Sequence, residues 1–113
     1  MPLLTKAEIL AANDLPIKEV EVPEWGGVVR LRALSVAQRE ALEDFMFNQG
    51  KRDQWRAYLV AATAVDENGE LLFGPDDVES LRGKSFDAVE RVFTAAKRLS
   101  GIGKEGREEA KKN

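Results

Sequence analysis

Two segments with alternating side chains flank a short glycine-containing stretch, and this pattern limits the fold more than any other feature of the sequence. In Ile17–Val22 valines alternate with glutamates, and in residues 28–33 aliphatic side chains alternate with arginines. A period of two residues is typical of a strand with one buried and one solvated face. Antiparallel pairing would set the two glutamates across from the two arginines on the solvated face. The sequence therefore predicts a β-hairpin near the N-terminus.

The connection between these strands is residues 23–27, Pro-Glu-Trp-Gly-Gly. Glycine adopts positive φ at little cost, as a tight reversal of the chain requires. Trp25 either folds back over the open face of the hairpin or is displayed at its tip for a partner. Because tryptophan is usually largely buried, folding back is the favoured interpretation.

Helix signals surround the hairpin. Thr5 and Glu8 form a capping-box pattern before a short helix that ends near Ala12, and Ser35 with Gln38 repeats the pattern before a helix to about Asn48. Later helices are expected after a cap at Asp53, from Pro75, and after a cap at Ser85. The apolar stripes of the three longer helices comprise Ala37, Ala41, Leu42, Phe45 and Met46, then Trp55, Tyr58, Leu59 and Ala62, and finally Phe86, Val89, Val92, Phe93 and Ala96.

These elements predict an α+β fold in which a short N-terminal helix and a β-hairpin precede a mainly helical bundle. Residues 1–100 are expected to form a single domain. Residues 101–113 contain one large apolar residue, Ile102, so they are expected to form a polar, flexible and disordered C-terminal tail.

Composition argues against several classes of function. The 113 residues carry a net charge of −3, so no global positive field attracts nucleic acid or anionic lipid. The chain has no cysteine and no histidine, which removes the commonest nucleophiles, bases and transition-metal ligands. No apolar run approaches the roughly 20 residues that cross a bilayer, and no signal peptide is recognisable, so a cytoplasmic protein is expected.

Three motifs resemble ligand sites without their usual context. Residues 101–106 match G-x-G-x-x-G but follow a predicted helix instead of a strand, and residues 83–85, Gly-Lys-Ser, lack the first glycine of a phosphate loop. In residues 66–70 the glycine falls at position four, where a calcium loop needs it at position six. Adjacent acids at residues 76–77 and 108–109 suit a helix start and a solvated tail. We therefore expect no catalytic residue, no cofactor and no metal site, and a protein that is not an enzyme.

Several segments resemble the tail assembly chaperones of long-tailed, siphovirus-type bacteriophages. These are residues 4–15, LTKAEILAANDL, the hairpin sequence EVEVPEWGGVVRLRALS, and residues 65–73, VDENGELLF. The resemblance continues through the short helix around residues 77–81 to the polar end of the chain, so it covers almost the whole sequence.

This resemblance implies a non-enzymatic assembly protein that is absent from the finished virion. It implies binding to the phage tape measure protein, which is kept soluble, and promotion of tail tube polymerisation, with homo-oligomer formation left open. It also implies a form extended by programmed frameshifting, and residues 111–113, Lys-Lys-Asn, are compatible with a slippery run of codons. The candidate partner-binding residues are Trp25, Met46 and Phe47, and the alternative is a small structural phage component such as a head–tail connector or tail-completion protein.

Overall fold

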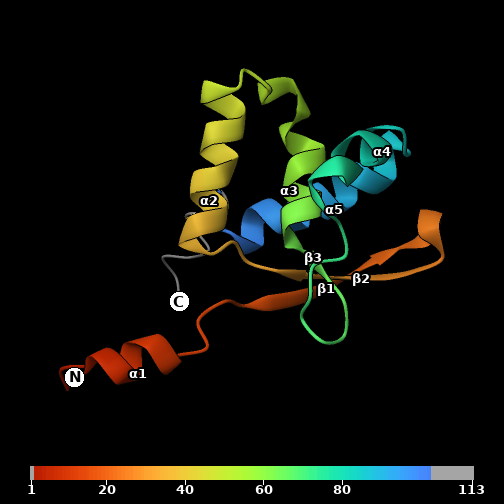
Figure 1. Ribbon diagram of the computed structural model, residues 1–113. Helices are drawn as coiled ribbons and strands as arrows, with labels where there is room; N and C mark the ends of the chain where they lie inside the picture. Colours follow the sequence, from red (N-terminus) through yellow and green to blue (C-terminus); the bar gives the residue numbers. More distant parts are fainter. Residues whose placement is uncertain (1, 103–113) are drawn as a thin grey trace.

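The protein is described here by a computed structural model that covers residues 2–102. Figure 1 shows a layer of helices above a small sheet, with one further helix standing apart near the N-terminus. The expected α+β class is confirmed. The elements are α1 (Lys6–Ala11), β1 (Ile17–Val22), β2 (Gly27–Arg32), α2 (Val36–Glu43), α3 (Trp55–Thr63), β3 (Ala64–Val65), α4 (Val78–Arg82) and α5 (Phe86–Leu99).

The hairpin forms where the alternation predicted it, with Val20 and Val22 buried on its inner face. Its register corrects half of the expected charge pairing. Glu19 lies opposite Arg30 and forms an ion pair with it, but Glu21 lies opposite Val28. The turn takes only four residues, so Val22 pairs with Gly27. Facing both glutamates with both arginines would require Val22 to pair with Val29, so the observed register differs from the expected one by two residues.

A third strand, β3, completes an antiparallel sheet in the order β1-β2-β3. It follows α3 directly and places Ala64 opposite Leu31 and Val65 opposite Arg30. The sequence did not predict this strand, because two residues at the end of a helical stripe show no alternation. Its pairing ties the centre of the helical layer to the hairpin.

The core lies between the sheet and two helices, α3 and α5, which pack against each other. Phe93 on α5 is fully buried and meets Trp55 of α3 edge-on, with ring centroids 4.6 Å apart. The expected burial of Phe86 is wrong, since 64% of this residue is exposed. It begins α5, where the guanidinium of Arg56 lies 5.3 Å from the ring centroid and its other face is open to solvent.

Helix α2 buries a narrower stripe than predicted. Leu42 and Phe45 are buried, whereas Ala37 and Ala41 are exposed. Figure 1 shows the reason: α2 runs beside α3 and stands clear of the sheet, so only one side of it is covered. The helix ends in a π-turn, Asp44–Asn48. The carboxylate of Asp44 accepts hydrogen bonds from the side-chain amides of Asn48 and of Gln49, which follows the turn, and these bonds lower the pKa of Asp44.

Most of the predicted helix starts are confirmed. The hydroxyls of Thr5, Ser35 and Ser85 each accept a hydrogen bond from the backbone N–H three residues later. The predicted cap at Asp53 is wrong, because the chain enters α3 through a 3-10 turn, Arg52–Gln54, and Gln54 at the cap position makes no such bond.

Among residues 2–102, no helix is long and apolar enough to span a bilayer. The C-terminal end of α5 is followed by Gly101 in the left-handed conformation. The remainder of the G-x-G-x-x-G pattern, the adjacent acids at 108–109 and nearly all of the tail expected at 101–113 lie outside the described residues.

Candidate protein-binding surfaces

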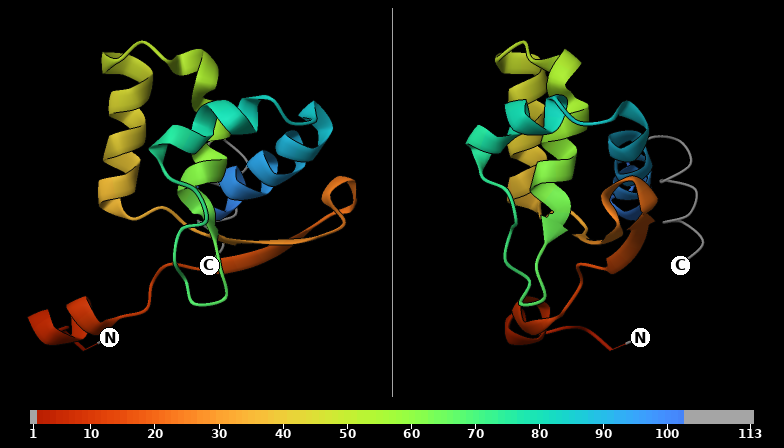
Figure 2. Two further views of the ribbon diagram at one scale, coloured as in Figure 1. Left: turned by 45° about the vertical axis from the view of Figure 1, so that its right-hand side comes forward. Right: turned by 90° about the vertical axis from the view of Figure 1, so that its right-hand side faces the viewer.

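The N-terminal arm, residues 2–16 with α1 at its centre, is the most exposed apolar segment of the protein. No residue of α1 is buried. Figures 1 and 2 show it on the side of the sheet away from α2, α3 and α4. The large apolar side chains that the arm leaves exposed are Leu3, Leu4, Ile9 and Leu10.

The capping box explains how so short a helix is held without burial. The Thr5 hydroxyl accepts from the Glu8 N–H at 3.2 Å, and the Glu8 carboxylate accepts from the Thr5 N–H at 3.0 Å. These two hydrogen bonds lower the pKa of Glu8, since they favour the carboxylate. The arm therefore presents preformed apolar side chains instead of packing them.

Deleting residues 2–11 is expected to leave the stability of the body almost unchanged. Because α1 has no buried residue, its removal opens no cavity, and the free energy of unfolding should change by less than about 0.5 kcal/mol, as at ordinary surface positions. Urea denaturation of the full chain and the truncated chain, followed by tryptophan fluorescence, measures this. A larger loss of stability would mean that the arm packs on the body.

A second apolar surface is a pocket of about 180 Å³ between α2, α3, α4 and the segment that precedes α4. Leu71, at its edge, and the neighbouring Leu72 are half exposed. The lining residues are mostly small or apolar: Gln38, Ala41, Tyr58, Ala61, Ala62, Leu71, Phe73, Gly74, Pro75 and Val78. This apolar pocket combines small side chains with an exposed leucine at its edge.

The polar groups of the apolar pocket are few and fixed. The Gln38 amide donates to the Ala62 carbonyl at 2.8 Å and accepts from the Ser35 N–H at 3.1 Å, so it is held at both ends. The Tyr58 ring stacks on Phe45 with centroids 4.3 Å apart. Burial, together with the negative charge of Asp44, raises the pKa of Tyr58, so its hydroxyl stays protonated at neutral pH.

The three residues predicted to bind a partner lie on two separate parts of the molecule. Trp25 occupies the hairpin turn and is 38% exposed, so it is neither folded fully into the core nor fully displayed. Phe47 is exposed in the π-turn after α2, while Met46 is half-buried against the core. In Figures 1 and 2 the hairpin turn and the end of α2 are well apart, so these residues do not form one site.

The hairpin turn is fixed to the body by charge. Glu24 forms an ion pair with Arg91 of α5 at 3.1 Å. Hydrogen bonds from the backbone and from Arg91 lower the pKa of Glu24. Gly26 adopts φ of 72° and closes the turn. Trp25 therefore lies on a turn that is anchored to α5 through the adjacent residue, Glu24.

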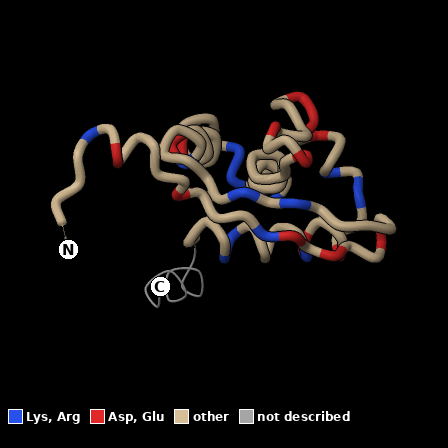
Figure 3. Tube along the Cα trace, turned by 90° about the horizontal axis from the view of Figure 1, so that it is seen from below, with Lys and Arg blue, Asp and Glu red and all other residues tan. Residues whose placement is uncertain are grey.

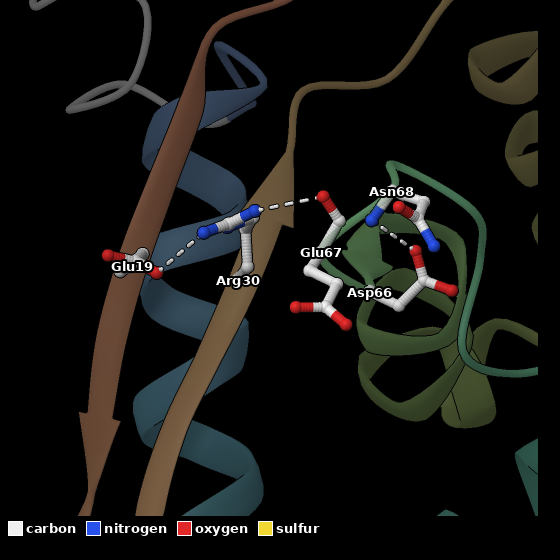
Figure 4. Close-up of polar contacts among 5 residues, drawn as sticks. All are labelled: Glu19, Arg30, Asp66, Glu67 and Asn68. Carbon is white, nitrogen blue, oxygen red and sulfur yellow. Dashed lines mark hydrogen bonds and ion pairs between the residues drawn. The ribbon is translucent and has the colours of Figure 1, made fainter.

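The charged face of the sheet is a structural network. Figure 3 shows basic residues along β2 beside acidic residues along β1. As Figure 4 shows, Arg30 donates to the Glu19 carboxylate at 3.2 Å and to the Glu67 carbonyl at 3.5 Å. Arg32 donates to the Gly69 carbonyl at 2.8 Å. These arginines therefore join the sheet to the loop after β3.

The loop that resembles a calcium site is an ordinary Asx turn. One carboxylate oxygen of Asp66 accepts from the backbone N–H of Asn68 at 2.8 Å, as Figure 4 shows. The same oxygen accepts from the backbone N–H of Glu70 at 3.0 Å. Within residues 2–102, no group of three or more acidic side chains is arranged to hold a metal ion.

Sequence reasoning missed both the arm and the pocket as surfaces. A signal for the arm was present, because its predicted helix carries apolar residues on a segment too short to bury them. The pocket had a weaker signal in the alanines at positions 41 and 62, which were interpreted as part of the helix stripes. Alanines at positions that face a neighbouring element leave space, but the sequence does not say whether a side chain fills it.

No protein-family model matches this sequence, and no curated protein matches it. Among solved structures, the protein is similar to the structure of the bacteriophage HK97 tail assembly chaperone, with a TM-score of 0.63 and 21% identical residues. The match covers 87% of this chain and 95% of that chain. The likeness thus extends over most of both chains, and the chain has the fold of the HK97 tail assembly chaperone.

Proposed function

We propose that this protein is a bacteriophage tail assembly chaperone that binds the tape measure protein and keeps it soluble until the tail tube polymerises around it. The fold it shares with the HK97 chaperone supports the role. The observation that carries the binding function is the N-terminal arm, whose apolar side chains the rest of the described chain leaves uncovered.

The physical basis is the covering of apolar surface. A long helical protein with exposed apolar stripes aggregates unless a partner covers those stripes. The arm and the apolar pocket offer such cover from two sides of one small domain, and helices commonly bind in grooves lined by apolar side chains. Covering and release need no chemical step, which agrees with a role that is not enzymatic and uses no cofactor.

The proposal extends to the partners and the place of action. The chaperone acts in the host cytoplasm and is left out of the mature virion. A form extended by frameshifting links the tape measure protein to the tail tube protein, and second copies of the chaperone can share the client.

Co-expression with the tape measure protein tests the proposal. The tape measure protein is expected to be mostly insoluble when expressed alone and mostly soluble with the chaperone, and to be retained by it in a pull-down. Purified virions should contain no chaperone detectable by immunoblot. A protein that is folded by circular dichroism but leaves the client insoluble, and that is found in virions, would instead be a structural component such as a head–tail connector.

A further inference from the structure

We propose that the apolar pocket binds an aliphatic side chain from a helical segment that carries lysine or arginine beside its apolar stripe. This inference rests on the proposed function and places a second client-binding site, besides the arm, in the groove between α2, α3 and the segment before α4. The size of the pocket, the hydrogen bonding of the backbone around it and the sign of the charge near its rim support this assignment.

The size of the pocket suits one side chain. An apolar cavity of about 150 Å³ holds a benzene ring, so the roughly 180 Å³ available here accommodates a leucine, isoleucine or phenylalanine. Ala41 and Ala62 lie along its walls, and Gly74 lies beside it. Such small residues let the backbone of a bound segment come close, which increases the dispersion contacts that it makes.

The surrounding backbone favours a helical partner over an extended one. An extended peptide gains affinity by pairing with free backbone groups at a sheet edge. The α2 and α3 walls belong to helices, whose hydrogen bonds are internal. The Leu72 N–H donates to the Ala64 carbonyl and the Gly74 N–H to the Asp77 carboxylate. A helix satisfies its own backbone and so needs only side-chain contacts here.

Acidic residues adjoin the rim of the pocket in sequence or through contacts with its lining residues. No lining residue carries a charge, and the lining residues Leu71 and Pro75 are each adjacent in sequence to an exposed acid, Glu70 and Asp76. The Asp77 carboxylate accepts from a lining residue, and the charge of Asp44 acts on the Tyr58 hydroxyl. Basic side chains on the bound helix would meet these acids.

One cation adjoins the pocket in sequence, and helical geometry turns it away. Arg39 follows the lining residue Gln38, but two positions separate it from Ala41, about 160° around the helix. Arg32 also approaches this part of the molecule, since it donates to the Gly69 carbonyl next to Glu70, but the four acids Asp44, Glu70, Asp76 and Asp77 outnumber these two cations.

The first test uses two synthetic 18-residue amphipathic helices with the same leucine pattern, one with lysine and one with glutamate at the polar positions. Titration of the full chain is followed by ¹⁵N NMR. The lysine peptide is expected to shift the amides of Ala41, Tyr58 and Phe73, and to bind at least tenfold more tightly than the glutamate peptide. Equal affinities, or shifts confined to other surfaces, would overturn the inference.

Matched variants separate pocket binding from general attraction to an acidic protein. Ala41→Phe fills the pocket from an exposed helix position and should weaken lysine-peptide binding at least tenfold, whereas Ala37→Phe, one turn earlier and outside the lining, should not. Replacing the rim acids with Glu70→Gln and Asp76→Asn should weaken binding about threefold or more, as expected for two exposed charge pairs. The matched control is Asp87→Asn with Glu21→Gln, which removes two exposed acids remote in sequence from the pocket.

The same variants distinguish failure of this inference from failure of the proposed function. If the chaperone solubilises the tape measure protein and Ala41→Phe does so equally well, the pocket is not a client site although the function holds. If the wild-type chain does not solubilise it, the function itself fails. Circular dichroism and thermal melting confirm that each variant is folded.

Discussion

Replacing Phe93 by alanine is expected to lower the free energy of unfolding by about 3–5 kcal/mol, the usual range for a buried phenylalanine. The side chain is 1% exposed and lies where α5 meets α3. Its ring packs edge-on against Trp55 and lies 4.9 Å from the Arg56 guanidinium and 4.8 Å from the Lys97 ammonium. Truncation would open a cavity and also remove these ring contacts.

The matched control is Phe86→Ala in the same helix. Because Phe86 is 64% exposed, its truncation should lower the free energy of unfolding by less than about 0.5 kcal/mol. Loss of the contact between its ring and Arg56 comes in addition to this value. Urea denaturation of both variants, monitored by circular dichroism, gives the two free energies. Similar losses at both positions would mean that the N-terminal end of α5 is covered in solution, by the chain itself or by a second copy.

This pair of phenylalanines shows where sequence reasoning succeeds and where it stops. Both fall on one helical stripe, and the period of 3.6 residues placed Phe93, Val92 and Ala96 in the core correctly. Periodicity defines the direction of a face but not how far the neighbouring element extends along it. Phe86 lies at the helix start and is 64% exposed, although the Arg56 guanidinium lies 5.3 Å from its ring centroid.

The hairpin was predictable because its two strands specify each other through alternation and a turn with glycine. Its exact register was not, since pairing both glutamates with both arginines would set Val22 opposite Val29, two residues beyond its actual partner, Gly27. Instead, Glu19 meets Arg30 while Glu21 meets Val28. β3 depends on tertiary position alone, because two residues carry no pattern of their own.

The candidate site was harder to predict than the fold for a physical reason. Binding surfaces are what packing leaves over, so they depend on the whole arrangement and not on any local pattern. Phe47, a candidate partner-binding residue, is exposed, yet the apolar pocket forms from three helices and a loop that only the folded chain brings together. The arm was predicted as a helix, but its separation from the body appears only in three dimensions.

The arm gives the second large expected effect, which is on function instead of stability. Changing Leu3, Leu4, Ile9 and Leu10 together to alanine should reduce retention of the tape measure protein at least tenfold. Complete burial of one such side chain contributes roughly 1.5–3 kcal/mol, and about 1.4 kcal/mol corresponds to tenfold in affinity. Alanine is the strongest helix former, and the capping box between Thr5 and Glu8 is kept, so α1 should still form.

A control variant alters polar positions of the same arm, Lys6→Ala with Asn13→Ala, and should retain the client as the wild type does. Retention is measured by pull-down at several salt concentrations, and sedimentation velocity of each chain shows whether the arm also joins copies of the chaperone. Since none of the four apolar residues is buried, thermal melting of both variants should match the wild type. Undiminished retention by the four-alanine variant would show that the arm does not contact the client, and would leave the apolar pocket as its remaining candidate site.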